Sequence, residues 1–375
     1  MSHERSDGTA ARRRARDLGI PFDGAPGPLN AITDVAGVTI GFTTLISGEG
    51  RLEVGKGPVR TGVSAILPRG AGGDPVFGGW YALNGNGEMT GTTWVEESGS
   101  VEGPIIITNT HSVGVVRDGV VEWLSRRHPR EAGDQGWLLP VVAETWDGFL
   151  NDANGHHVTK EHAFAALDRA RSGSVDEGNV GGGTGMMLHR FKGGTGTSSR
   201  LVSAGVGDYT LGALVQANYG AREELTIAGV PVGRAFPDLM PGPERDAAGG
   251  SCIVVVATDA PLLPHQLKRL ARRAPLGIGR TGGIGAHTSG DILIAFSTAN
   301  HAAWGGNAIA HIEMLPSELM NPLLRATVGA TEEAVINALI AAETMTGRDG
   351  NTAHAIPHDR LREVLRRHRR LIQQS

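Results

Sequence analysis

The junction between Gly250 and Ser251 has the clearest potential for chemistry in this sequence. Ser251 opens a very apolar segment, SCIVVV, and it follows a stretch at 237–248 that is rich in proline, glycine and charge. A flexible linker that runs into a buried strand is the plain interpretation. If the chain instead cuts itself after Gly250, Ser251 becomes a new N-terminus that carries a hydroxyl nucleophile and an α-amine base on one residue.

The strand that follows this junction is apolar on both faces. Because alternate residues of a strand point to opposite sides, Ser251 would share one face with Ile253 and Val255, and Cys252 would share the other with Val254. A strand with two apolar faces is typical of a position between two layers. We therefore expect Ser251 at the end of a buried strand, beside the core.

A second polar pair opens another predicted strand, at 289–298. Ser289 and Asp291 are two positions apart, which puts the hydroxyl and the carboxylate on one face, about 7 Å apart along the strand. Gly290 between them lets another backbone or a substrate come close. The pair could hold an amine or a hydroxyl in place. The alternative is a turn in which both side chains cap the preceding loop.

Three residues near other predicted strand ends could contact a substrate. Asn218 ends a strand and could aim its NH₂ group at an oxyanion. Glu144 and Trp146 follow the buried segment 138–143, and an acid beside an aromatic ring can hold a cationic group. In each case an ordinary turn, with a packed tryptophan in the second, is the alternative.

Several familiar motifs fail in their context. The segment 277–282 matches GxGxxG, but a predicted helix precedes it and a strand follows, the reverse of a dinucleotide site. The glycines at 181–185 lack the Lys-Ser/Thr ending of a phosphate-binding loop. His156, His157 and His162 lack metal-ligand spacing. The sequence therefore predicts neither a metal nor a cofactor.

Composition limits the class of protein. The 375 residues are 40% hydrophobic and 20% charged, and the formal net charge of −4 gives no electrostatic case for binding nucleic acid or an anionic membrane. The single cysteine, Cys252, excludes a disulfide within the chain. No run approaches the length of a membrane span, and no signal peptide is recognisable, so we expect a cytoplasmic protein.

The order of predicted elements favours an α+β fold. We expect a disordered basic arm at 1–17, and the length of the remaining chain suits one large domain or two smaller ones. Predicted strands lie at 36–46, 61–68, 76–83, 104–109, 138–143, 251–256 and 289–298. The segments 199–217 and 225–231 also have β character, and the glycine-rich segment 178–196 predicts a loop or a pair of short strands. Predicted helices lie at 112–127, 159–172, 263–274, 331–346 and 358–373. Strands and helices come in clusters without regular βαβ alternation, which is typical of α+β layers.

Nine segments together resemble the L-aminopeptidase/D-esterase family, which includes the β-peptidyl aminopeptidases. They are NAITDVAGVTIG (30–41), VRTGVSAILPRG (59–70), LNGNGEMTG (83–91), TNTHSVG (108–114), ETWDG (144–148), GNVGGGTGM (178–186), VQANYG (215–220), GGSCIVVVATDAPL (249–262) and SGDILIAFST (289–298). The similarity runs in order over nearly the whole chain after the basic arm.

The resemblance implies a single catalytic domain at 18–375, with a four-layer αββα sandwich formed from one self-cleaved precursor. Cleavage between Gly250 and Ser251 would give an α chain of residues 1–250 and a β chain of residues 251–375. Such αβ units typically assemble as homotetramers. The activity implied is that of an aminopeptidase acting on small peptides, amides and esters with a free amine.

The resemblance also assigns roles. Ser251 matches the nucleophile and Asn218 the oxyanion donor. Ser289 and Asp291 match a pair that orients the nucleophile and its amine, although some relatives carry a glutamate at the position of Asp291, one methylene longer. In the same way, the acid at 144 matches the anchor for the substrate ammonium.

The aromatic Trp146 matches a pocket position whose identity varies, which leaves the preference among D-, L- and β-amino acids open. The alternative to an aminopeptidase is a self-processing acyltransferase of the ornithine acetyltransferase kind, which uses a related architecture. That class uses threonine as its nucleophile, whereas this chain has Ser251.

Overall fold

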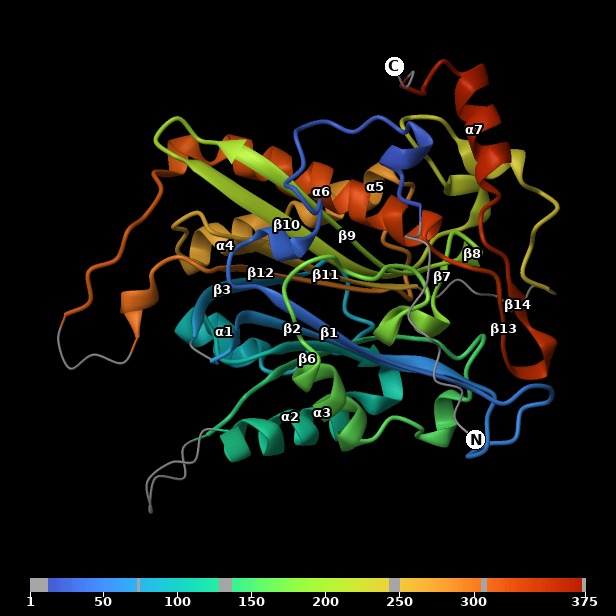
Figure 1. The fold of residues 1–375 in the computed structure, drawn as a ribbon, viewed down its shortest axis with the longest axis horizontal. Helices are drawn as coiled ribbons and strands as arrows, with labels where there is room; N and C mark the ends of the chain where they lie inside the picture. Colours follow the sequence, from blue (N-terminus) through green and yellow to red (C-terminus); the bar gives the residue numbers. More distant parts are fainter. Residues whose placement is uncertain (1–12, 73–74, 128–136, 243–249, 305–308, 373–375) are drawn as a thin grey trace.

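A computed structural model describes residues 13–72, 75–127, 137–242, 250–304 and 309–372. Two β-sheets stack face to face, and helices cover the outer face of each, as Figure 1 shows. Apolar side chains form separate clusters between the two sheets and beneath each helical layer. This is the predicted αββα sandwich.

The smaller sheet has the strand order β1-β2-β5-β6. Its strands are β1 (Thr39–Ser47), β2 (Val59–Ala71), β5 (Ile105–Asn109) and β6 (Val141–Thr145). All neighbours are antiparallel except β5 and β6, which are parallel. Helices α2 (Val113–Arg127) and α3 (Lys160–Asp168) pack on its outer face, where Val120 and Ala163 share a cluster with Ala65.

The larger sheet has the order β4-β3-β12-β11-β10-β9. Its strands are β4 (Ser100–Val101), β3 (Val76–Ala82), β12 (Gly290–Ser297), β11 (Ser251–Thr258), β10 (Asp208–Asn218) and β9 (Gly194–Ser203). Only β11 and β12 run parallel. The helices on its outer face are α4 (Pro264–Ala271), α5 (Ala274–Arg280) and α6 (Asn321–Ile340). Helix α6 approaches β9 so closely that a Cβ atom on Gly196 would lie 2.0 Å from the Ala334 carbonyl oxygen.

Shorter elements complete the fold. They are α1 (Thr92–Ser98), α7 (His358–Arg367), the pair β7 (Met187–Leu188) and β8 (Phe191–Lys192), and the pair β13 (Met345–Thr346) and β14 (Thr352–Ala353). The glycine-rich segment forms a 3₁₀ helix, Gly181–Gly185, directly before β7.

The face alternation predicted for the Ser251 strand is confirmed. Ile253 and Val255 belong to the cluster between the two sheets, whereas Cys252 and Val254 belong to the cluster beneath α4 and α6. Strand β11 is therefore covered on both faces. Its first residue, Ser251, shares the face of Ile253, which points to the other sheet.

Two expectations about elements are wrong. The segment 225–231 is not a strand, because Ala228 and Gly229 have φ angles of +51° and +77° and turn the chain back, leaving one isolated bridge between Ile227 and Val230. The helix expected at 331–346 is α6, which begins at Asn321 with Pro322 in its first turn. Proline fits there because the first helical N–H groups have no partner inside the helix.

The prediction of a disordered arm at 1–17 is wrong for its last residues. Residues 1–12 lie outside the described residues, but the last part of the arm belongs to the folded domain. Arg14 Nε pairs with Glu177 at 2.6 Å, and Arg16 Nε pairs with the fully buried Glu333 at 2.7 Å. These two arginines therefore attach the end of the arm to the domain.

Candidate active site

Three central strands of the larger sheet, β10, β11 and β12, place predicted site residues at the same end of the sheet. Asn218, the last residue of β10, lies directly opposite Ser251, the first residue of β11. Ser251 lies beside Gly290 in the parallel register of β11 and β12. Residues far apart in sequence are thereby brought together by strand register alone.

The Ser251 hydroxyl faces two hydrogen-bond donors. Its Oγ accepts the backbone N–H of Trp146 at 3.2 Å and lies 3.4 Å from Nδ2 of Asn218. Ser251 is itself buried. Two N–H donors beside the nucleophile's oxygen lie near the place where the oxyanion forms when Oγ attacks a carbonyl group.

The orientation of the Asn218 amide is fixed from both ends. Oδ1 accepts the backbone N–H of Met187 at 2.8 Å, and Nδ2 donates to the Trp146 carbonyl at 2.9 Å. With its oxygen held by a donor, the amide presents its NH₂ group toward Ser251. This geometry fits the oxyanion role that the resemblance implies for Asn218.

Glu144 is a buried acid that lines the same cavity as Ser251. Its carboxylate accepts hydrogen bonds from the Thr110 hydroxyl and, at 3.1 Å, from the backbone N–H of Glu88. Burial raises the pKa of Glu144, and the hydrogen bond from Thr110 partly offsets this rise. A buried carboxylate with fixed donors on both oxygens can pair with one cationic group, which is the role that the resemblance implies for Glu144.

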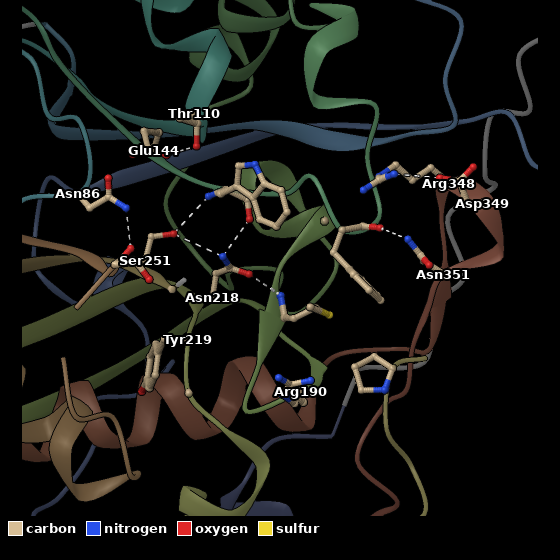
Figure 2. Close-up of a pocket in the computed structure, with 18 residues that line it drawn as sticks. Asn86, Thr110, Glu144, Arg190, Asn218, Tyr219, Ser251, Arg348, Asp349 and Asn351 are labelled. Atoms are coloured by element: carbon tan, nitrogen blue, oxygen red, sulfur yellow. Dashed lines mark hydrogen bonds and ion pairs between the residues drawn. The ribbon is translucent and has the colours of Figure 1, made fainter. Parts of the chain in front are cut away.

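A cavity of about 670 Å³ joins these groups. Ser251, Asn218, Glu144 and the half-exposed ring of Trp146 lie along it. Figure 2 shows Glu144 and Arg348 toward opposite ends of the cavity. The space is sufficient for a small substrate of a few residues.

Ser289 and Asp291 form the expected pair, but behind the cavity wall. Ser289 Oγ donates to Asp291 Oδ1 at 2.9 Å, and Asn84 Nδ2 donates to the other carboxylate oxygen at 3.1 Å. Burial raises the pKa of Asp291. Neither side chain lines the cavity or hydrogen-bonds to the Ser251 side chain among the described residues, so a role in orienting the nucleophile stays a prediction.

Sequence reasoning missed several groups that complete the site. Thr110 and Asn84 each support a carboxylate, and the N–H of Gly290 donates to the carbonyl oxygen of Gly250 at 2.9 Å. Thr110 and Asn84 lie inside two of the family-like segments, which was the available signal. The contact made by the backbone N–H of Gly290 could not be predicted from residue types.

Two searches of the described residues bear on function classes. No group of three or more His, Cys, Asp or Glu residues within them lies together in a way that could hold a metal ion. Among the helices of the same residues, none has both the length and the apolar character needed to cross a bilayer.

Stacked sheets with helices outside, and a buried serine that begins a central strand, define a hydrolase of the N-terminal-nucleophile fold class. The chain belongs to peptidase family S58, whose model matches residues 30–353. The resemblance to the L-aminopeptidase/D-esterase family is thereby confirmed.

Individual relatives agree with this assignment. Beta-peptidyl aminopeptidase BapA of Sphingosinicella microcystinivorans is 54% identical over 374 residues, covering 96% of this chain and 93% of that protein. The structure of an L-aminopeptidase D-Ala-esterase/amidase from Ochrobactrum anthropi matches with a TM-score of 0.90 at 51% identity, covering 96% of this chain and 99% of that one. A β-aminopeptidase of Burkholderia sp. matches with a TM-score of 0.85 at 45% identity, covering 95% and 99%.

The chain is therefore a serine aminopeptidase/esterase of this family. The acyltransferase alternative finds no support in these comparisons.

Proposed function

We propose that Ser251 is the nucleophile of a self-processing aminopeptidase. The observation that carries this proposal is the position of Ser251 Oγ, which faces the N–H groups of Trp146 and Asn218 in the cavity that also holds Glu144. Cleavage of the Gly250–Ser251 bond would give chains of residues 1–250 and 251–375 and free the amine of Ser251.

The geometry around Gly250 supports self-cleavage. Ser251 Oγ attacks the Gly250 carbonyl carbon, the C–N bond breaks, and the acyl group moves from nitrogen to oxygen. Water then hydrolyses the ester and leaves a carboxylate on Gly250. The N–H of Gly290, 2.9 Å from the Gly250 oxygen, polarises this carbonyl and stabilises its developing negative charge. A Cβ atom at 250 would lie 2.9 Å from that of Tyr219, so the position favours glycine.

The amine released on Ser251 supplies the base for substrate hydrolysis. An α-amine has an ordinary pKa of about 7.7–8.0, which suits proton transfer near neutral pH. It accepts the Oγ proton as Oγ attacks the substrate carbonyl, and it returns that proton to the leaving group. Asn218 Nδ2 and the Trp146 N–H stabilise the oxyanion, at about 3–4 kcal/mol for each donor. Water then releases the acyl group.

The substrate enters with a free amine at Glu144. A buried carboxylate pairs with an ammonium group by charge and hydrogen bonding, and the exposed face of Trp146 adds a second attraction for a cation. Small peptides, amides and esters of amino acids fit this arrangement. The relatives' names make β-peptides and D-alanyl esters the first compounds to compare with L-aminoacyl amides.

Assembly and location stay predictions from the sequence. We propose a homotetramer of αβ units in the cytoplasm. Light scattering coupled to size-exclusion chromatography tests the tetramer, because a monomeric αβ unit would contradict it.

Trapping the acyl-enzyme tests the nucleophile. The enzyme is quenched in acid during turnover of an aminoacyl ester, and the intact masses are recorded. The 251–375 chain should gain the mass of one acyl group, located by fragmentation on Ser251. An acyl group located on any residue other than Ser251 would contradict the assignment.

A further inference from the structure

A fully buried lysine lies behind the oxyanion donor. Lys192, in β8, donates through Nζ to the carbonyl oxygens of Gly193 at 2.8 Å, Met186 at 2.9 Å and Gly183 at 3.4 Å. Burial of an ammonium group is unfavourable unless hydrogen bonds replace its lost hydration. An apolar side chain of similar volume would fill the same space without that penalty, so the amino group calls for an explanation.

One of these carbonyl groups belongs to a peptide that leads to the active site. The Met186 carbonyl accepts from Lys192 Nζ, and the N–H group of the same peptide, on Met187, donates to Asn218 Oδ1 at 2.8 Å. Asn218 Nδ2 points toward Ser251 Oγ, 3.4 Å away (Figure 2). Two amide groups in series therefore form a relay from the ammonium group to the oxyanion position.

The position of the Met186–Met187 peptide does not depend on the lysine side chain alone. The backbone N–H of Gly193 also donates to the Met186 carbonyl, at 2.9 Å, and the N–H of Met186 donates to the Gly183 carbonyl at 3.3 Å. These backbone bonds help to hold the peptide plane in place. What Lys192 adds is a positive charge against the carbonyl oxygen.

We propose that Lys192 is a positioning residue that strengthens the oxyanion donor of Asn218. A cation at a carbonyl oxygen polarises the peptide and makes the N–H at its other end a stronger donor, and hydrogen bonds in series reinforce one another. Asn218 Nδ2 thereby becomes a stronger donor to the developing oxyanion. Lys192 lies behind the cavity wall and touches no substrate itself. The inference rests on the proposed function, in which Ser251 attacks and Asn218 stabilises the oxyanion.

The size of the expected effect can be worked out from the contribution of one oxyanion donor. Removal of such a donor lowers kcat by about 100- to 1000-fold. Reinforcement within a series of hydrogen bonds amounts to about 10–30% of each bond. Applied to the free energy that Asn218 contributes, this fraction corresponds to a change in kcat of about two- to eightfold, and we expect about fivefold.

A double-mutant cycle with Asn218 tests the relay. Lys192→Gln keeps a hydrogen-bond donor but removes the charge. It should lower kcat for an aminoacyl p-nitroanilide about fivefold with little change in KM, because the effect is confined to the transition state. In the Asn218→Ala background the same substitution should change kcat by less than about twofold. Equal losses in both backgrounds, or an unchanged kcat in Lys192→Gln alone, overturn the relay.

A reversible inhibitor supplies a second readout that needs no variant of Asn218. An aminoalkyl boronic acid takes Ser251 Oγ at its boron atom, and one boronate oxygen of the tetrahedral adduct occupies the oxyanion position. The inhibition constant should rise about fivefold in Lys192→Gln, while the KM of the p-nitroanilide stays within about twofold. An unchanged inhibition constant, or an inhibition constant and a KM that rise by the same factor, overturns the relay.

Arg222 provides a matched control that contacts the same hairpin. It is also a buried cation, and its guanidinium donates to the carbonyl groups of His189 and Arg190, between β7 and β8. Neither carbonyl belongs to the peptide that hydrogen-bonds to Asn218. Arg222→Gln should therefore change kcat by the same factor in both backgrounds. A loss that depends on Asn218 as strongly as that of Lys192→Gln would show that a loosened hairpin is the cause, and would overturn the relay.

Self-cleavage and a conservative variant guard against general damage. Lys192→Gln should cut itself with a half-life within about twofold of the wild type, because the donor to the Gly250 carbonyl is the N–H of Gly290, outside the relay. Equal slowing of self-cleavage and of turnover overturns the proposal. If Lys192→Gln does not fold, Lys192→Arg, which keeps the cation, should retain kcat to within about twofold, and a folded Lys192→Arg enzyme with a fivefold loss contradicts the relay.

The outcomes separate the relay from the proposed function. Failure of the wild type to hydrolyse any aminoacyl p-nitroanilide, or full activity of Asn218→Ala, counts against the proposed function and removes the basis of the relay with it. A large loss in Asn218→Ala, together with equal losses from Lys192→Gln in both backgrounds, leaves the proposed function standing and overturns the relay alone.

Discussion

Asp147, the residue after Trp146, offers a stability prediction that can be worked out from the structure. Its carboxyl group is buried and accepts one hydrogen bond, from Asn151 at 3.1 Å, while Oδ2 accepts none with good geometry. Burial raises its pKa from an ordinary value of 3.8 to about 6. Hydrogen bonding from Thr61, Asn151 and Asn109 lowers this pKa, but burial has the larger effect.

The pH dependence of the free energy of unfolding follows from the difference in the pKa of Asp147 between the folded and unfolded chains. The folded chain holds the Asp147 proton more tightly than the unfolded chain does, so this contribution to stability is complete below pH 3.8 and is lost as pH rises through about 6. Since each tenfold difference in proton affinity is about 1.4 kcal/mol, the loss amounts to about 3 kcal/mol.

Asp147→Asn should therefore stabilise the protein at alkaline pH. In the Ser251→Ala background, which keeps one chain, urea unfolding at about pH 8 should show a gain of up to about 3 kcal/mol, and this gain should fall toward zero at about pH 4. Asp152→Asn is the control, because Asp152 hydrogen-bonds to His157 at 2.9 Å and its loss should destabilise. A pH-independent effect of Asp147→Asn, or a loss at pH 8, refutes the reasoning.

Two substitutions probe the site itself. Glu144→Gln should lower kcat/KM for aminoacyl p-nitroanilides about 10- to 100-fold more than for esters without an amine, and equal losses would contradict the ammonium anchor. Because burial raises the pKa of Glu144, the wild-type preference for a free amine should weaken as pH falls, earlier than for an exposed glutamate. Gly290→Ala would put a Cβ atom 2.3 Å from the Asn86 carbonyl oxygen and displace the N–H that reaches Gly250, so self-cleavage should slow about tenfold on a gel time course. An unchanged half-life would argue against that donor.

The strand pattern was informative wherever side chains alternate. The faces of β11 could be predicted because Ile253 and Cys252 must enter different cores, and the contact between Ser289 and Asp291 follows from a spacing of two. Local backbone conformation was harder to predict. Ala228 adopts a positive φ, which is rare for alanine, and the resulting turn interrupts the segment 225–231 that the sequence predicts to be extended.

The candidate site shows a similar division. The residues at strand ends, Asn218 and Ser251, were found by type and by resemblance, and strand register brings them together. Thr110 and Asn84 donate hydrogen bonds to buried carboxylates, and these contacts depend on how the segments that follow β5 and β3 fold. No periodic pattern carries that information, because each contact joins segments that are distant in the chain.

Intact mass measurement tests the central claim most directly. Purified wild-type protein, denatured and weighed, should give two chains that correspond to residues 1–250 and 251–375, whereas Ser251→Ala should give one uncut chain. Wild-type protein that hydrolyses an aminoacyl p-nitroanilide while remaining a single 375-residue chain would contradict the account.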